Sequence, residues 1–120
     1  MEETLFDIEG NAIAYVAADD GHTIYLWSGR PVAYLDEERI YGFNGIHLGW
    51  YENGVIFNLV GERNGFSKSS LPVFAKFEPF KSFKQFSPFK AFKEFAKTKP
   101  YWKSSMSKTP LSQFLSRGGK

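Results

Sequence analysis

The chain has 120 residues and no cysteine, and phenylalanine supplies 13 of its aromatic side chains, which make up 18% of the sequence. This length suits one domain with an appendage, and the lack of cysteine excludes a disulfide framework, a thiolate metal site and thiolate catalysis. The net charge of +2 conceals an asymmetry: residues 1–70 carry four basic and eleven acidic side chains, whereas residues 71–120 carry eleven basic and two acidic ones. Because opposite charges on one chain attract, we predict that the basic part docks on the acidic part.

The N-terminal residues, Met-Glu-Glu-Thr, show neither the basic nor the apolar region of a signal peptide. No later run approaches the about 20 apolar residues that a membrane-spanning helix needs. We therefore expect a cytoplasmic protein without a transmembrane segment.

Residues 1–70 repeat one pattern four times, centred on the four glycines Gly10, Gly29, Gly45 and Gly61. An aromatic residue precedes each glycine by four positions, a small residue follows it by four, and a second aromatic follows it by five. The small residues are Ala14, Ala33, Gly49 and Gly65, and the second aromatics are Tyr15, Tyr34, Trp50 and Phe66. Such regularity in four segments predicts four copies of one structural unit.

Each unit is typical of a β-hairpin whose two-residue turn ends in the glycine. Asn44-Gly45 is the strongest such signal, because both central residues of a type I′ turn need positive φ, whereas Val60-Gly61 predicts a looser turn. The acids between units, Asp19, Asp20, Asp36, Glu37 and Glu38, are interpreted as solvated turn residues, with weak cation binding as the alternative. Isolated hairpins are marginal in water, so we predict an all-β fold of four successive hairpins around a pseudo-fourfold axis. The small residues are expected near that axis, where four backbones crowd together.

The repeated segments, Leu5–Val16, Ile24–Leu35, Ile40–Tyr51 and Ile56–Ser67, together with a tail rich in Phe, Lys and Pro, resemble the bacterial four-fold β-flower proteins. The similarity extends through the tail to Leu115. The resemblance implies the fold and assigns no site residues.

From Phe74 to Phe95 a phenylalanine occupies every third position. This period fits the three residues per turn of an extended polyproline II rod, which also tolerates Pro79 and Pro88. We predict that residues 71–103 form a strap that docks on the hairpins through its phenylalanines, one per hairpin, with its lysines in solvent. Four hairpins cannot bind all eight phenylalanine rings if the strap crosses each hairpin once, so some of the rings are left for a partner. The predicted partner-binding residues are Phe80, Phe83, Phe86, Phe89 and Phe92. Contact with a membrane surface or with single-stranded nucleic acid is the alternative use of alternating Phe and Lys.

The last segment, residues 104–120, is predicted to form a short helix with a frayed end. Thr109-Pro110 supplies suitable first residues, and Leu111, Phe114 and Leu115 form an apolar face. Tyr101 and Trp102, just before this segment, are expected to anchor the strap, and residues 116–120 are expected to fray.

No catalytic constellation is readable, and His22 and His47 lack metal-ligand spacing. We therefore expect that the protein is not an enzyme and that it binds neither a metal ion nor a cofactor. The function that we favour is a non-enzymatic protein-interaction or structural module whose partner is another protein, since the acidic head disfavours nucleic acid; the oligomeric state is left open. The alternative is a small-ligand site in an axial mouth lined by four aromatics with a histidine and an arginine nearby: Tyr15, Tyr34, Trp50, Phe66, His47 and Arg30.

Overall fold

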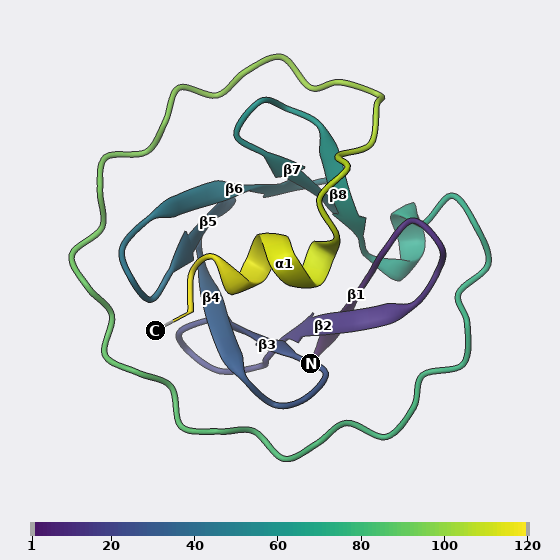
Figure 1. Cartoon of the computed structure of the whole chain (residues 1–120), viewed down its shortest axis with the longest axis horizontal. Helices are drawn as coiled ribbons and strands as arrows, with labels where there is room; N and C mark the ends of the chain where they lie inside the picture. Colours follow the sequence, from purple (N-terminus) through teal and green to yellow (C-terminus); the bar gives the residue numbers. More distant parts are fainter. Residues whose placement is uncertain (1, 120) are drawn as a thin grey trace.

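The computed structural model describes residues 2–119 and contains eight short strands, each antiparallel to the next, that close into a barrel (Figure 1). The strands are β1 (Glu3–Phe6), β2 (Ala12–Val16), β3 (Thr23–Leu26), β4 (Pro31–Asp36), β5 (Arg39–Gly42), β6 (His47–Glu52), β7 (Val55–Asn58) and β8 (Arg63–Phe66). Pairing of Phe6 with Phe66 closes the barrel between the first and the last strand. The predicted quartet of hairpins is therefore confirmed: β1–β2, β3–β4, β5–β6 and β7–β8.

The four hairpin turns are equivalent, but they are not of the predicted type. In each, the glycine N–H donates to the carbonyl three residues earlier, as Gly10 does to Asp7 at 3.0 Å and Gly61 does to Asn58 at 3.0 Å. Only the glycine has positive φ, so each turn is a type I turn closed by a glycine bulge. Val60 is consequently unstrained, and the expected looseness of the fourth turn is wrong.

Aliphatic side chains fill the barrel together with helix α1 (Leu111–Ser116). The predicted apolar face of the helix is confirmed, because Leu111, Phe114 and Leu115 are all buried in this core. The helix begins one residue later than Pro110, and the Thr109 side chain does not cap it.

The small residues four positions after each hairpin glycine meet both a neighbouring strand and α1 where they are glycines. A Cβ added to Gly49 would lie 2.1 Å from the Phe57 carbonyl oxygen of β7 and 3.1 Å from Phe114, and one added to Gly65 would approach Leu111 to 3.0 Å. The expected crowding of backbones is therefore confirmed at Gly49, and both glycines also leave room for α1.

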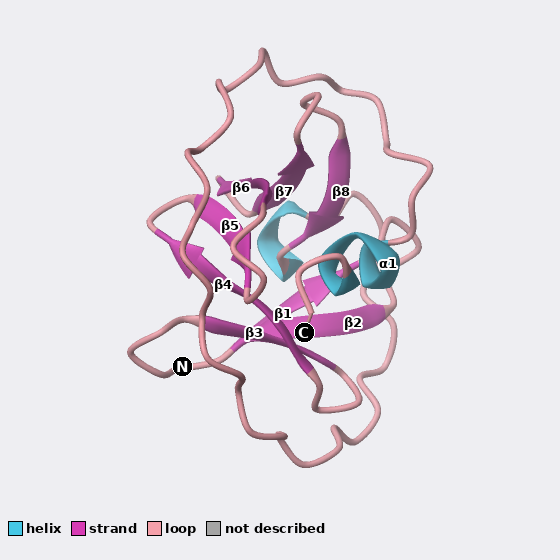
Figure 2. Ribbon diagram, turned by 60° about the vertical axis from the view of Figure 1, so that its left-hand side comes forward, coloured by secondary structure: helices cyan, strands magenta, loops and turns pink. Residues whose placement is uncertain are grey.

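Residues 71–103 run around the whole barrel as a strap, preceded by the short 3₁₀ helix η1 (Lys68–Ser70). Figure 2 shows the strap as an open loop outside the strands, and Figure 1 shows it surrounding all four hairpins. The result is a disc with Cα extents of 38 × 36 × 23 Å.

The chain end beyond α1 packs against the barrel, so the expected fraying is wrong for residues 117–119. The Asn44 side-chain amide donates to the Arg117 carbonyl at 2.7 Å, and Gly118 is buried against Gly42. Lys120 lies outside the described residues.

Candidate functional site

The strap is attached to the hairpins through its backbone at intervals of nine residues. The N–H groups of Lys76, Gln85, Glu94 and Lys103 each donate to the carbonyl of a hairpin glycine, Gly10, Gly29, Gly45 and Gly61 respectively, all at 2.9 Å. Three Phe-x-x triplets therefore span one hairpin.

Each hairpin glycine serves this contact as well as its turn. A Cβ on Gly29 would overlap the carbonyl oxygen of Phe83 at 1.9 Å. On the other three glycines it would lie 2.2 to 2.5 Å from the carbonyl oxygens of Phe74, Phe92 and Tyr101. Only glycine permits both the positive φ and this approach of the strap.

Four lysines of the strap, Lys81, Lys84, Lys90 and Lys93, contact aromatic rings of the barrel. The Lys81 ammonium lies 4.3 Å from the Tyr15 ring centroid, and nine residues later the Lys90 ammonium lies 4.0 Å from that of Tyr34. Such cation–π contacts contribute about 0.5–1 kcal/mol at exposed sites. The expectation that the strap lysines meet only solvent is therefore wrong for these four.

Three of these lysines also form ion pairs with acids of the barrel. Lys81 and Lys84 both contact the Glu2 carboxylate, the latter at 2.7 Å, and Lys93 contacts Asp36 at 2.8 Å. Hydrogen bonds from these ammonium groups hold the pKa of Glu2 and of Asp36 below its usual range. The predicted docking of the basic tail on the acidic head is confirmed, and Asp36 is not the purely solvated turn residue expected.

Trp102 replaces a lysine in the fourth repeat. Lys84 and Lys93 lie over Tyr25 and Tyr41 at 5.8 and 5.6 Å, whereas Trp102 stacks on the equivalent Phe57 with centroids 4.1 Å apart. Trp102 is therefore the anchor that the sequence predicted. Its neighbour Tyr101 is 96% exposed and is not an anchor.

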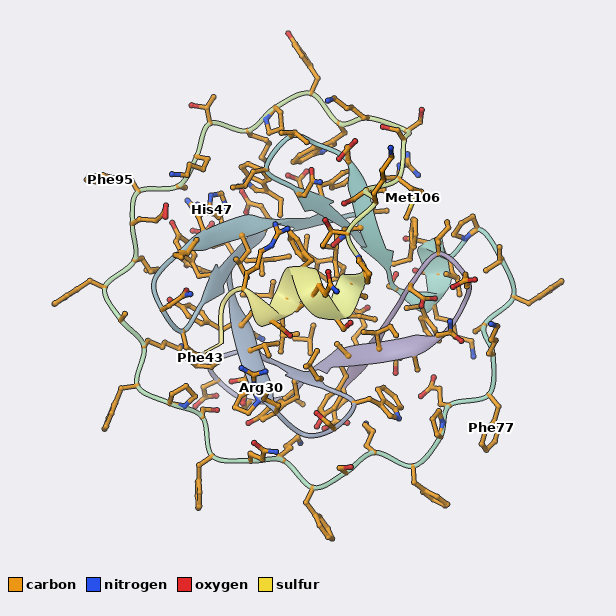
Figure 3. The ribbon with its side chains drawn as sticks, in the orientation of Figure 1. Arg30, Phe43, His47, Phe77, Phe95 and Met106 are labelled. Carbon is orange, nitrogen blue, oxygen red and sulfur yellow. The ribbon has the colours of Figure 1, made fainter. Side chains whose placement is uncertain are left out.

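The phenylalanines of the strap point away from the barrel, which corrects the prediction that they seat on it. All eight are at least 89% exposed, and the labelled Phe77 and Phe95 lie outside the ring of the strap (Figure 3). The residues are Phe74, Phe77, Phe80, Phe83, Phe86, Phe89, Phe92 and Phe95. The inner face is already held by backbone and lysine contacts, so the period of three puts every phenylalanine on the opposite face. We call these eight residues the phenylalanine rim.

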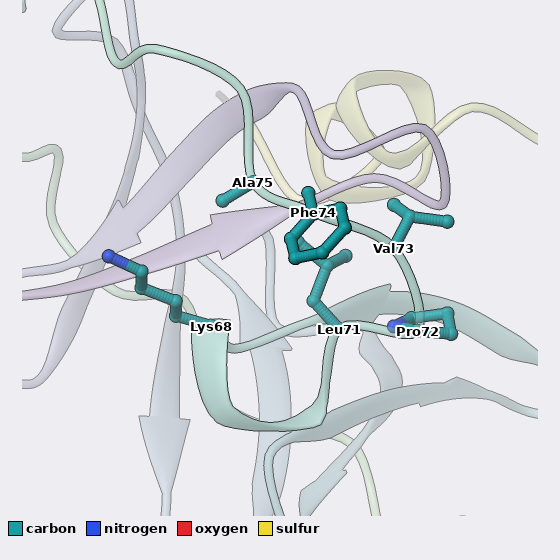
Figure 4. A pocket seen from close by; sticks show the side chains of 6 residues that line it. All are labelled: Lys68, Leu71, Pro72, Val73, Phe74 and Ala75. Carbon is teal, nitrogen blue, oxygen red and sulfur yellow. The ribbon is translucent and has the colours of Figure 1, made fainter.

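An open pocket of about 560 Å³ marks the start of the strap (Figure 4). Leu71, Pro72, Val73 and Phe74 line it, with Lys68 from η1 at its edge. The pocket is apolar and includes the first residue of the rim, so it extends the same surface.

The predicted axial mouth does not form. Tyr15, Tyr34, Trp50 and Phe66 are buried on the outer face of the strands, because successive side chains of a strand alternate between faces and the small residue before each one points inward. Tyr15, Tyr34 and Phe66 lie in three separate clusters rather than in one ring, and α1 fills the axis. The Trp50 ring contacts those of His47 and Trp102. Arg30, the predicted polar neighbour, lies beside Gly119 instead.

His47, the other predicted ligand contact, supports the strap. Its Nδ1 accepts the Lys97 N–H at 2.9 Å, and its Nε2 lies 3.0 Å from the Gly49 carbonyl, to which it donates. Both nitrogens are used by the neutral imidazole, and burial keeps the pKa of His47 below its ordinary value.

The contacts that sequence reasoning missed are the strap lysines and the nine-residue register. The spacing of Lys81, Lys90 and Lys99 carried this signal, because it equals three Phe-x-x triplets. Among residues 2–119 no group of three histidine or acidic side chains is arranged to hold a metal ion. Nor does that part of the chain contain a helix long and apolar enough to cross a membrane.

Comparison with known proteins agrees with the hairpin pattern. The family model described as 4-fold beta flower protein matches residues 3–115, which include the barrel, the strap and most of α1. Searches of curated proteins and of solved structures gave no match. The chain therefore belongs to the 4-fold beta flower protein family.

Proposed function

We propose that the protein is a non-enzymatic interaction module that docks on another protein through its phenylalanine rim. The observation that carries the proposal is the exposure of all eight rings, each at least 89%. Together they offer about 1,200 Å² of aromatic surface if each contributes about 150 Å². Monomeric proteins rarely expose more than a few hundred square ångströms of contiguous apolar surface, and larger exposed areas mark sites of interaction.

The shape of the rim favours a concave partner. The rings radiate around a disc of 38 × 36 Å, so a flat or convex surface reaches only a few of them. A concave apolar surface reaches them all, and its contact then exceeds the about 800 Å² per partner of a standard interface. A larger assembly with such a socket is the partner that we propose, and the cytosol is the proposed compartment.

The membrane and nucleic-acid alternatives are less well supported. Both use lysines beside the aromatic rings to contact phosphates. In the strap, Lys81, Lys84, Lys93 and Lys99 instead pair with carboxylates of the barrel.

Photo-crosslinking in cells tests the proposal. A photoreactive phenylalanine analogue is placed at Phe83, Phe86 or Phe92, and a control analogue is placed at Ile8, an exposed residue of a hairpin tip. We expect the same protein to be crosslinked from all three rim positions and not from Ile8. Crosslinks to lipid alone, or no rim-specific product, would reject a protein partner.

A further inference from the structure

The tips of neighbouring hairpins enclose four notches at the α1 end of the barrel. Each notch lies between the residues that follow one hairpin glycine and those that precede the next. The notch between the first and second hairpins is closed by the strands themselves, because the Trp27 N–H donates to the Ile13 carbonyl at 2.9 Å.

Two other notches are occupied by later segments of this chain. Between the fourth and first hairpins, Arg63 forms a parallel bridge with Met106: its N–H donates to Ser105 at 2.9 Å, and its carbonyl accepts from Ser107 at 2.8 Å. The Asn64 amide donates to the Thr109 carbonyl at 2.8 Å and so holds the same segment. This contact explains why Asn64 stands where the other hairpins have an apolar residue.

The notch between the second and third hairpins holds residues 117–119. Gly118 lies against Gly42 and the Val32 carbonyl, and its own carbonyl accepts the Asn44 N–H at 3.4 Å. Residues 117–118 form the turn that ends α1, so of the two segments only residues 105–107 are extended, but both bind their notch through backbone hydrogen bonds.

The remaining notch, between the third and fourth hairpins, is an open pocket of about 440 Å³. Phe114 forms part of its lining from the buried core, and the exposed fractions of Ile46 and Val60 are 45% and 53%. Arg117 also lines it and forms no ion pair within residues 2–119. Leu48 and Leu59 complete the apolar part of its lining.

We propose that this notch binds an extended segment of a partner protein that carries an apolar side chain followed or preceded closely by a carboxylate. The apolar side chain packs on Phe114 and Leu48, and the carboxylate meets the Arg117 guanidinium in a charge-assisted hydrogen bond. Extended geometry follows from the parallel bridge between Met106 and Arg63 in the equivalent notch, and the chemistry follows from the lining of the open one. The site is separate from the phenylalanine rim and does not depend on its role.

The test is selection from a displayed library of random heptapeptides with the full chain as bait, followed by titration of the synthetic consensus peptide. We expect a consensus with an apolar residue and an acid within three positions of each other. Val60→Asp, at an exposed wall of the notch, should raise Kd by about tenfold or more, which corresponds to a loss of about 1.4 kcal/mol. The matched control is Val73→Asp, because Val73 is 45% exposed and lies outside the notch.

Charge reversal sharpens the result. Arg117→Glu should weaken the binding of the acidic peptide. It should strengthen the binding of the same peptide with lysine in place of the acid, because complementary charges determine which partner binds. A library without a consensus, or a consensus peptide that binds Val60→Asp as well as the unmodified chain, would overturn the site. Loss of peptide binding in Phe83→Ser would also overturn the notch as the binding site, because the peptide would then occupy the rim. We expect Phe83→Ser to bind the peptide as well as the unmodified chain does, which separates this proposal from that for the rim.

Discussion

The barrel interior and the strap use phenylalanine in opposite ways. Phe114 is 1% exposed and packs among aliphatic side chains inside the barrel, whereas Phe83, on the strap, is 97% exposed. The barrel is held by apolar burial, and the strap is held by glycine carbonyls, lysine–carboxylate pairs and cation–π contacts. A stripe of aromatic residues therefore does not by itself identify the face of a segment that packs on its own domain.

The largest effect is expected from the barrel interior. Phe114→Ala removes a ring from a closed core that includes Leu111 and Leu115, and truncations of this kind cost about 3–5 kcal/mol. Urea unfolding followed by tryptophan fluorescence measures the loss. A change below about 1 kcal/mol would show that α1 does not support the barrel.

A smaller effect is expected where the strap meets a hairpin. Gly29→Ala puts a Cβ at a residue with φ of 92° and against the Phe83 carbonyl. The left-handed backbone alone costs about 1–2 kcal/mol, and the Gln85 N–H should lose its protection from hydrogen exchange. Gly21→Ala is the control, because its nearest neighbour would lie 3.4 Å away and no positive φ is required. Equal effects of the two substitutions would contradict the strap contact.

Acidification should loosen the third strap segment. Because burial holds the pKa of folded His47 below its ordinary value of 6.5, the folded state binds fewer protons than the unfolded state. Its contribution to stability is therefore present above pH 6.5 and is lost as the pH falls further. Protonation breaks the bond from the Lys97 N–H and changes the fluorescence of Trp50, whose ring lies 4.6 Å from that of His47.

Two variants separate this transition from general acid unfolding. His47→Gln should remove the fluorescence change that accompanies acidification below pH 6.5, and His22→Asn, at an exposed histidine with positive φ, should retain it. A change that survives in His47→Gln would exclude His47 as its origin. Loss of the Lys84–Glu2 and Lys93–Asp36 pairs follows at lower pH, because the pKa of each carboxyl group is already below its usual range.

The smallest effect on stability is expected at the rim. Phe80→Ser, Phe86→Ser and Phe89→Ser remove exposed rings, so each should change the free energy of unfolding by no more than about 0.5 kcal/mol. Urea unfolding of the triple variant, beside Phe114→Ala, is the direct comparison. A destabilisation like that of the core would mean that the rim packs on the barrel.

Most of the barrel could be predicted from the sequence because its signals are local. The four glycines, the alternation around them and the apolar face of α1 each follow from the geometry of one hairpin or one helix. The predicted turn type was wrong because the glycine is the fourth residue of the turn rather than its second central residue.

The strap could be predicted as a three-residue rod, but not which of its faces packs. That choice depends on which groups lie opposite it, and Glu2 and Tyr15 on the first hairpin meet Lys81 only once the barrel has formed. The prediction of an axial mouth was wrong for a similar reason, because α1, from the end of the chain, occupies the axis.

Residue-resolved hydrogen exchange of the strap tests the central claim most directly. If the strap is held by its inner face in a nine-residue register, the amides of Lys76, Gln85, Glu94 and Lys103 are protected. The amides of Phe77, Phe86 and Phe95, one position further along, exchange much faster. Uniformly fast exchange across residues 74–103, or protection that follows the phenylalanines, would contradict the claim.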